Sequence, residues 1–598
     1  MKIYLWMFYL AACGSASLAQ VAPLSTTVVV VGNPEPVTVG ESNRSVVVMD
    51  TEQTRFAFET VEDYLRTDTS TFIAQRGAGG AQADISIRGT SFEQTLVLLN
   101  GLRINDAETS HNNLDLPVPL AAMRAINVLH GAGSTLYGSD AIGGVVDFLT
   151  AVPSGNTLRL RSGAGSFGAN DQLVIGTLSG RRWTEMLAGE RNFSTGFMVD
   201  RDYRNESGSS ESRYTSAVGV TDILLAGNDR AFGANQFYGN YDSWERTKGW
   251  FASMQQELGT KASAAFGYRR HADNFILLRS APAVYANNHI DQSWQGVVRR
   301  KETIGNKTSL FYGLEGDGDS IYSNNLGRHA RNWGAGYLDI DLRPSQRISM
   351  SAGLREEIIG GGEKVTSPML AAGYFITQKV KLRGSLGYGF RMPTYLDLYY
   401  SDPSTIGNPH LKSESAWNFE VGADWFASRK VYVTSTVFYS RQHDAIDYLR
   451  ASENDLWQAT NLSGLRFTGI EGSMIWQPAS SQQIKFGWTA LSGAQHALHG
   501  YESEYVFNYP VNNASAEWIS RFYPGYMLHT RLGVTERYQK DPYAVWDISL
   551  ARARGRVHPY LQMTNLTNTA YQEVLNVPMP GRAFTGGIEL WLGKLPAN

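Results

Sequence analysis

The chain is poor in cysteine, in charge and in long apolar runs. Its 598 residues include one cysteine, Cys13, and 18% charged residues, which is below the roughly one quarter of an average soluble domain. A disulfide framework within the chain is therefore excluded. Beyond the N-terminus, no apolar run reaches the roughly 18 residues that a membrane-spanning helix needs. A helical membrane protein is excluded, but a β-barrel is not, because barrel strands alternate apolar and polar side chains.

Signatures of catalysis and of nucleic-acid binding are also missing. The sequence contains no Gly-x-Ser-x-Gly elbow and no His-Glu-x-x-His pair. The formal net charge of −3 gives no indication of a nucleic-acid partner. Scattered carboxylates could still serve a secreted glycosidase of β architecture, which is the enzyme alternative. Glycosidase activity in a soluble fraction would reveal it. We predict that the protein is not an enzyme.

The first residues have the pattern of an export signal. Lys2 precedes an apolar stretch at residues 3–12, and small residues end at Ala19. This pattern predicts a signal peptide over residues 1–19. A second interpretation is a lipoprotein box that ends at Cys13, with this cysteine carrying the lipid. Cleavage after Ala19 would leave a mature chain without thiols.

A β-branched segment follows the signal. Residues 26–31 read Thr-Thr-Val-Val-Val-Val, and Pro34 and Pro36 come soon after. Such a run beside prolines should be extended and poorly packed, which makes it available to add a strand to another protein's sheet. The alternative is the first strand of the domain that follows.

Residues 124–150, RAINVLHGAGSTLYGSDAIGGVVDFLT, carry the most specific pattern. A short apolar strand is followed by Gly131 and Gly133, which permit a tight backbone path. A phosphate loop would need Gly-Lys-Ser/Thr here, and a dinucleotide fingerprint would need glycine at Leu136, so neither nucleotide motif fits. The stretch resembles the plug of TonB-dependent outer-membrane receptors.

The surrounding residues 45–155 predict one small mixed α/β domain. Residues 60–65 indicate a short helix with Thr60 as its cap and Asp63 completing a capping box. Asn100-Gly101 between apolar runs is a strong hairpin signal. In the resembled family, residues 87–89 and 98–101 belong to the plug sheet, which implies a structural role for them here.

After residue 156 the pattern changes to repeated strands. Ile348, Met350, Ala352 and Leu354 alternate with polar or small residues, and so do Leu382, Leu386, Tyr388 and Phe390. Two further motifs resemble the same family: residues 389–394 with 407–411 and Glu414, and residues 565–571 with 580–582, which resemble the terminal hairpin used in barrel assembly. One departure is that the chain runs past Trp591, whereas family members usually end on an aromatic residue.

The resemblance implies an all-β transmembrane barrel of about 22 antiparallel strands, residues 156–598, occluded by an N-terminal mixed α/β plug. It implies a location in the outer membrane of a Gram-negative-type bacterium, among outer-membrane lipids. It also implies import driven by TonB and its inner-membrane energising proteins. The segment that TonB grips would lie in residues 20–44, in a TonB box formed by Thr26, Thr27, Val28, Val29, Val30 and Val31.

Long loops would face the exterior and catch the ligand. We expect them at residues 200–241, 280–288, 400–408 and 500–508. By resemblance, plug segments 76–82 and 105–113 lie at the apex. Candidate ligand-binding residues are Gln82, Asn105, Glu108, Ser110, His111 and Asn112, and His410 in a loop.

The length and layout resemble the cobalamin receptor group, so a corrinoid is the expected ligand, with ferric siderophores as competitors. A haem receptor with His111 and His410 as axial ligands is an alternative, and so is a surface adhesin or signalling barrel without import. No cofactor is expected beyond structural calcium. Five aspartates offer oxygen ligands for that ion, although their spacing matches no calcium loop: Asp200, Asp202, Asp222, Asp229 and Asp242.

Overall fold

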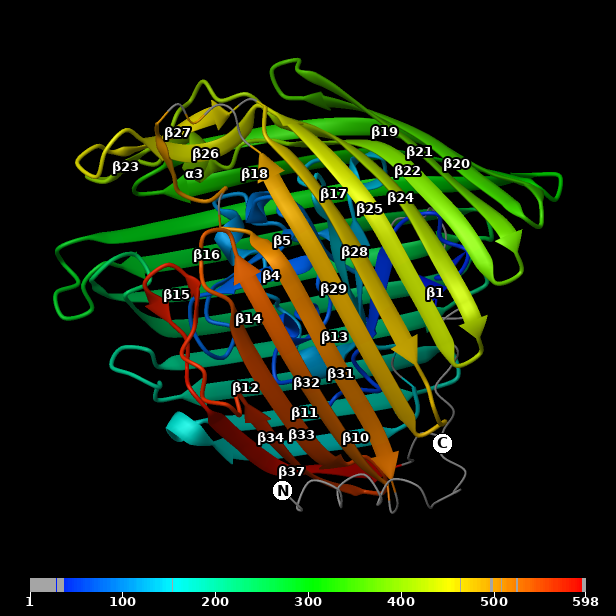
Figure 1. Ribbon diagram of the computed structural model, residues 1–598, viewed down its shortest axis with the longest axis horizontal. Helices are drawn as coiled ribbons and strands as arrows, with labels where there is room; N and C mark the ends of the chain where they lie inside the picture. The colour runs from blue at the N-terminus through cyan, green and yellow to red at the C-terminus, as the bar shows by residue number, and fades with distance from the viewer. Residues whose placement is uncertain are drawn as a thin grey trace.

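The computed structural model describes residues 28–29, 37–152, 154–462, 464–494, 498, 500–506, 508–522 and 525–593. The described chain forms a closed barrel of long strands with the N-terminal domain inside it (Figure 1). Among the described residues, no helix is both long and apolar enough to cross a membrane. The predicted signal peptide, with Cys13, lies outside the described residues.

The barrel wall has 22 antiparallel strands, and the last strand pairs with the first. Closure leaves no free sheet edge, so every strand finds backbone partners without water. In chain order the strands are β10 (Thr157–Gly165), β11 (Asn170–Ser179), β12 (Trp183–Ser194), β13 (Tyr203–Thr215), β14 (Val220–Asn235), β15 (Asp242–Leu258), β16 (Ala262–Ile276), β17 (Ala286–Ile304), β18 (Thr308–Ser323), β19 (Gly327–Ser345), β20 (Ile348–Ile359), β21 (Lys364–Thr377), β22 (Val380–Arg391), β24 (Glu414–Ser428), β25 (Val431–His443), β28 (Arg466–Trp476), β29 (Gln482–Ala494), β31 (Pro510–Phe522), β32 (Tyr526–Arg537), β33 (Tyr543–Arg552), β34 (Val557–Thr564) and β37 (Ala583–Gly593). The predicted fold class is confirmed.

The plug is built on a five-stranded sheet of order β3-β8-β9-β6-β7 and a separate β4-β5 hairpin. The predicted helix is confirmed as α1 (Val61–Leu65), with Thr60 and Asp63 forming the capping box. A further helical turn is α2 (Ser134–Tyr137). The strands are β3 (Val46–Asp50), β4 (Thr71–Gln75), β5 (Ala83–Ile87), β6 (Thr95–Leu99), β7 (Leu102–Arg103), β8 (Met123–His130) and β9 (Gly144–Thr150). The main apolar cluster joins plug residues such as Phe148 to wall residues such as Val297, so plug and barrel share one core.

Two glycine positions explain local plug geometry. Gly101 has a φ of 77° and closes the predicted hairpin between β6 and β7, where Leu99 pairs with Leu102. A Cβ on Gly144 would lie 2.2 Å from the carbonyl oxygen of Leu129, so β8 and β9 can approach each other closely because this residue lacks a side chain. Gly144 thus serves strand packing, whereas Gly131 and Gly138 each have a φ of 77°.

The outer surface of the wall carries the predicted apolar rows. Leu354 on β20 is 50% exposed and Leu382 on β22 is 43% exposed, as expected of side chains that face lipid. The prediction is wrong for Phe390, which does not face outwards: it is 1% exposed and belongs to a buried cluster with Trp333 and Ile359. It lies at the end of β22, where the chain leaves the regular wall for the loop that follows.

Short turns connect the strands at one end of the barrel and longer loops at the other. The prediction of a long loop at residues 200–241 is wrong, because most of this range forms β13 and β14. These strands pair continuously, from Tyr203 opposite Phe232 to Thr215 opposite Val220. The serine-rich and charged sequence of β13 lacks an apolar alternation. Its extended form depends on neighbouring strands, which no local pattern reveals.

Three of the long loops meet in a small four-stranded sheet of order β23-β27-β26-β30, which we call the loop sheet. Its strands are β23 (Thr405–Ile406), β26 (Ala445–Arg450), β27 (Trp457–Leu462) and β30 (Glu502–Ser503). The first of these loops also contains α3 (Tyr395–Tyr399). Figure 1 shows β23, β26, β27 and α3 together at one end of the barrel.

Candidate functional site

The predicted apical plug segments, residues 76–82 and 105–113, lie against the long loops. The backbone N–H of Tyr395 in α3 donates to the carbonyl oxygen of Ala107 over 3.1 Å. The N–H of Leu396 donates to the backbone carbonyl oxygen of Glu108 over 3.0 Å. The hydroxyl of Tyr238, in the loop after β14, donates to the Gln82 side chain over 2.8 Å. The loops therefore hold the apex by direct hydrogen bonds.

An ion-paired triad stands at the centre of the apex. Asp84 lies 2.8 Å from Nη1 of Arg76 and 2.7 Å from Nδ1 of His111. Burial alone would raise the pKa of Asp84, but the charges of Arg76 and His111 hold it below its usual range. Asp84 is thus an anion that fixes the ring of His111.

Aromatic rings continue from this triad towards the loop sheet. The His111 ring stacks on Phe92 with centroids 4.4 Å apart, and Tyr505 meets Phe92 edge-on at 5.3 Å. Tyr505 follows β30, and Tyr448 of β26 lies 6.0 Å from it. Packed aromatic rings therefore join the loop sheet to the apex.

The other predicted binding residues lie in different surroundings. Asn105 is internal to the plug, where its side chain accepts from the N–H of Val97 and donates to the carbonyl oxygen of Thr95. Ser110 and Asn112 are buried in the same short turn as His111, and Glu108 faces His289 of the wall at 3.4 Å. His410 is exposed on the loop between β23 and β24. The structure brings the plug residues together under the loops and leaves His410 at the surface.

Sequence reasoning named the motifs around Arg391 and Glu414 but missed that they meet. These residues pair across β22 and β24, and the Arg391 guanidinium contacts the Glu414 carboxylate. It also lies 3.1 Å from Asp397 in α3 and 2.9 Å from Glu93 of the plug. One buried guanidinium thus ties the wall, a loop helix and the plug together.

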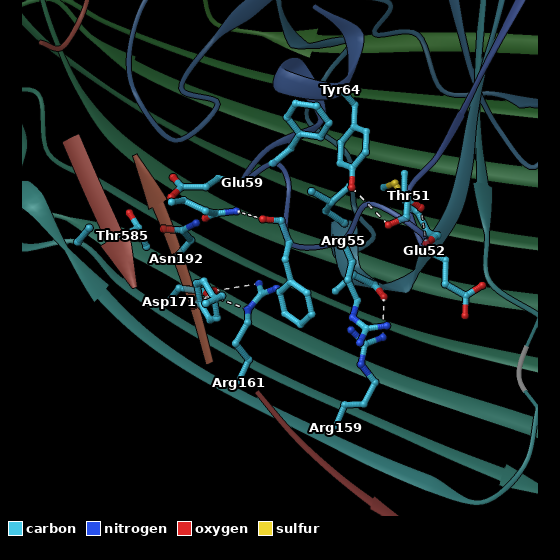
Figure 2. A pocket seen from close by; sticks show the side chains of 18 of the residues that line it. Thr51, Glu52, Arg55, Glu59, Tyr64, Arg159, Arg161, Asp171, Asn192 and Thr585 are labelled. Atoms are coloured by element: carbon cyan, nitrogen blue, oxygen red, sulfur yellow. Dashed lines mark hydrogen bonds and ion pairs between the residues drawn. The ribbon is translucent and has the colours of Figure 1, made fainter. Parts of the chain in front are cut away.

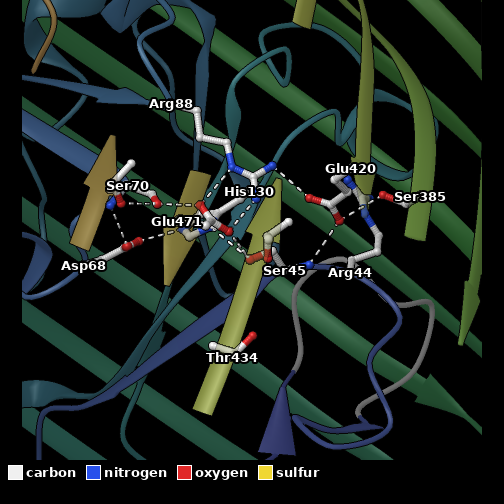
Figure 3. Close-up of polar contacts among 12 residues, drawn as sticks. Arg44, Ser45, Asp68, Ser70, Arg88, His130, Ser385, Glu420, Thr434 and Glu471 are labelled. Carbon is white, nitrogen blue, oxygen red and sulfur yellow. Dashed lines mark hydrogen bonds and ion pairs between the residues drawn. The ribbon is translucent and has the colours of Figure 1, made fainter. Parts of the chain in front are cut away.

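A second missed contact, which we call the latch, joins Arg88 of the plug to Glu420 of β24 and Glu471 of β28. The guanidinium lies 2.8 Å from Glu420 and 2.6 Å from Glu471. Figure 3 shows Arg88 between the two glutamates, with His130 and Asp68 on the Glu471 side. Arg88 follows the end of β5 and has a φ of 54°. The motif at residues 87–89 therefore anchors the plug to the wall as well as shaping it.

His130 extends the latch inside the plug. Its Nε2 lies 2.7 Å from Asp68 and its Nδ1 lies 3.3 Å from Glu471. Burial alone would lower the pKa of His130, but Asp68 and Glu471 raise it to about 9. The imidazolium is therefore charged at neutral pH and partly balances the buried carboxylates.

The chain before the plug is held at the short-turn end of the barrel. Val28 and Val29 form β1 (Val28–Val29), which pairs with β2 (Val37–Thr38) in a sheet separate from the plug sheet. Thr26, Thr27, Val30 and Val31 lie outside the described residues. Further on, Nζ of Lys381 donates to the carbonyl oxygens of Gly40, Glu41 and Ser42. Residues 42–44 are buried, so the end of the predicted linker is part of the packed structure.

The five aspartates suggested for calcium do not form one cluster, although Asp200, Asp202 and Asp242 all contact Arg279 or the next residue. Asp200 and Asp202 share Arg279 at 3.1 and 2.5 Å. Asp222 and Asp229 lie seven residues apart on β14, and each has its own arginine, Arg213 or Arg246, at 2.6 Å. Asp242 accepts from the N–H of Ser280. Arginine already balances four of the five carboxylates, so the structure provides no shared oxygen cage.

A side pocket opens between the plug and the wall where the first and last strands meet. Its lining includes Arg55 and Glu59 of the plug and Arg159 and Arg161 of β10. Figure 2 shows the two wall arginines on one side and the plug residues on the other. The guanidinium groups of Arg55 and Arg159 lie 4.6 and 4.9 Å from the ring of Trp591.

A closed barrel with apolar outer rows, filled by its own N-terminal domain and roofed by long loops, defines the class of plugged outer-membrane transport barrels. Comparisons with known proteins agree. Residues 38–145 match the TonB-dependent receptor plug domain, and residues 156–570 match the TonB-dependent receptor-like β-barrel. The chain belongs to the TonB-dependent receptor family. It is a transporter of the outer membrane, not an enzyme, and its energy-coupling partner is TonB.

Among relatives, the chain is 25% identical to a vitamin B12 transporter BtuB of Vibrio vulnificus over 76% of each chain. A second BtuB of the same species is 24% identical over 95% of each chain. The structure superposes on the siderophore receptor PirA of Acinetobacter baumannii with a TM-score of 0.74 and 14% identity, covering 92% of this chain and 98% of PirA. The copper transporter OprC superposes with a TM-score of 0.77 and 15% identity, covering 96% and 100%. These two structures support the fold alone.

Proposed function

We propose that this receptor binds a cobalamin-type corrinoid at the cell surface and imports it to the periplasm. The observation that carries the proposal is the match to relatives named vitamin B12 transporters, one of them over 95% of both chains at 24% identity. The arrangement of the apex is compatible with such a ligand. The packed rings of His111, Phe92 and Tyr505 lie beside polar side chains at this end of the plug, and aromatic and polar groups together suit a large ligand with amide side chains.

A ferric chelate is the second candidate. The favouring observation is the arginine and aromatic content of the apex, where the Arg76 guanidinium, paired with Asp84, lies 6.0 Å from the ring centroid of Tyr238. Anionic chelates are recognised by such guanidinium groups. Haem binding with His111 and His410 as axial ligands is less compatible with the geometry, because Nδ1 of His111 lies 2.7 Å from Asp84 and His410 is exposed on a loop.

Equilibrium binding to the detergent-purified chain tests the substrate. Cyanocobalamin is titrated beside haemin and a ferric siderophore panel, each with calcium and with chelator. Saturable cyanocobalamin binding supports the proposal, and its loss in a His111→Ala variant with retained binding in His410→Ala places the ligand at the apex. Capture of an iron chelate without cyanocobalamin binding would overturn the corrinoid proposal but keep the transporter.

We further propose that residues 20–44 carry the contact with TonB, through the box at residues 26–31. Support comes from β1, which pairs with β2 apart from the plug sheet and so can exchange its partner for a strand of TonB. Deleting residues 26–31 should abolish uptake while surface binding survives. Unchanged uptake would contradict energised import and favour an adhesin or signalling barrel.

A further inference from the structure

Three segments near the loop end carry metal-ligating side chains separated by one residue. They are Asp106 and Glu108 on the apical plug segment, His271 and Asp273 on β16, and His289 and Asp291 on β17. In a strand, residues two apart point to the same face, and the burial of the four wall side chains places them towards the lumen. The register of β16 and β17 pairs His271 with Asp291 and Asp273 with His289.

The wall therefore presents two rows, each with one imidazole and one carboxylate, and the plug adds one carboxylate to each row. In the first row the ligand atoms of Asp106, His271 and Asp291 lie within 4.8 Å of one another. In the second row the ligand atoms of Glu108, Asp273 and His289 also lie within 4.8 Å of one another.

The two rows differ in charge balance. Arg269 lies 2.8 Å from Asp106 and 2.9 Å from Asp291, so the first row already has its cation. In the second row, no arginine or lysine of the described chain pairs with Glu108 or Asp273, and the nearest basic group is Nε2 of His289, 3.4 Å from Glu108.

Both rows contain buried atoms without a hydrogen-bond partner, but those of the first row, on His271 and Asp291, lie within ion-pair distance of a neighbour. Oε2 of Glu108, Oδ1 of Asp273 and Nδ1 of His289 are buried without a hydrogen-bond partner among the described residues. The three residues are 2%, 8% and 3% exposed. Adjacent buried carboxylates are costly unless a proton or a cation compensates them, and a neutral imidazole is the commonest metal ligand among side chains.

We propose that Glu108, Asp273 and His289 bind one divalent first-row transition-metal ion of the Zn²⁺ type, which links the plug apex to the barrel wall. One imidazole and two carboxylates form a donor set that suits such ions, and water completes their coordination. Calcium prefers six or more oxygen ligands, so it fits this site less well. The proposal rests on these three residues and does not depend on which solute is imported.

The test uses the full-length receptor in detergent, stripped of metal with a chelator and dialysed. Zn²⁺ binding is measured by calorimetry, and Co²⁺ is added separately because its visible spectrum reports nitrogen and oxygen ligands. We expect one ion per chain with a dissociation constant on the order of 1 μM. Asp273→Asn and His289→Gln should each weaken binding by about 100-fold or more.

Two controls make the result specific. His410→Gln removes an exposed imidazole and should leave the affinity unchanged. Asp291→Asn alters the first row, and a larger loss there than in Asp273→Asn would overturn the assignment to the second row. If the second-row variants fail to assemble, the wild-type Co²⁺ spectrum still decides, because a chain that binds no ion has carboxylates compensated by protons. Cyanocobalamin binding, measured in parallel without zinc, tests the transport proposal independently.

Discussion

Arg88 is the residue whose loss should have the largest effect on the plug. An Arg88→Met variant leaves Glu420 and Glu471 buried without their guanidinium, and removing one partner of a buried ion pair typically costs about 3–5 kcal/mol. We expect the urea midpoint of plug unfolding, followed by fluorescence, to fall accordingly. Arg191→Met is the matched control, because its pair with Glu206 is 45% and 42% exposed and should contribute less than about 1 kcal/mol. Equal losses would contradict the latch.

His130 should give plug stability an alkaline pH dependence. Its pKa is raised to about 9 in the folded state, above the unfolded value of about 6.5. Its stabilising contribution is therefore complete below about pH 6.5 and is lost as pH rises through about 9. The difference in unfolding free energy between wild type and His130→Gln should shrink across this window. A difference that stays constant from pH 6 to 10 would show that His130 acts without its charge.

Local patterns predicted some residues of the site and missed others for a clear reason. Thr60 and Asp63 lie three residues apart, so a capping box is readable from the sequence. Arg88 and Glu471 are 383 residues apart, and their meeting depends on the barrel register. The sequence indicates His111 but not its partner Asp84, because Asp84 follows the predicted apical segment 76–82 and lies within strand β5.

At the scale of elements, the approach of β8 to β9 depends on Gly144. In a Gly144→Ala variant the new methyl group would collide with the carbonyl oxygen of Leu129, and overpacking of this kind costs about 1–3 kcal/mol. We expect reduced protease resistance of the plug. Gly176→Ala in β11 is the control, because its Cβ would meet no atom within 4 Å. A Gly144→Ala plug as resistant as wild type would contradict the close packing.

The elements also show where periodicity stops being informative. β20 was predicted from its alternation, since one face meets lipid and the other the lumen. The sequence of β13 indicates a loop instead, because its serines and charges do not distinguish two faces. Its residues are extended because β12 and β14 pair with them along their length, and such non-local pairing leaves no signature within the strand itself.

At the scale of the whole molecule, the outer apolar rows should determine how deeply each wall residue lies in the bilayer. Leu354 lies in the middle of β20, so Leu354→Arg places a charge near the bilayer midplane and should cost about 2–4 kcal/mol. Ile304 ends β17 beside a turn and is 60% exposed, so Ile304→Arg should cost about 0–1 kcal/mol. Heat-modifiable migration on SDS gels reports barrel assembly. Similar assembly of both variants would contradict the predicted depth.

The loop sheet has a consequence for how the entrance works. Its strands come from the loops that follow β22, β25 and β29, yet backbone hydrogen bonds join them into one sheet. Lifting any one loop therefore means breaking that sheet or carrying the other two along. If the three loops move together, the entrance opens as one rigid unit. Ligand access would then follow a single opening rate, and a crosslink that fixes any one of the three loops would keep the whole entrance closed.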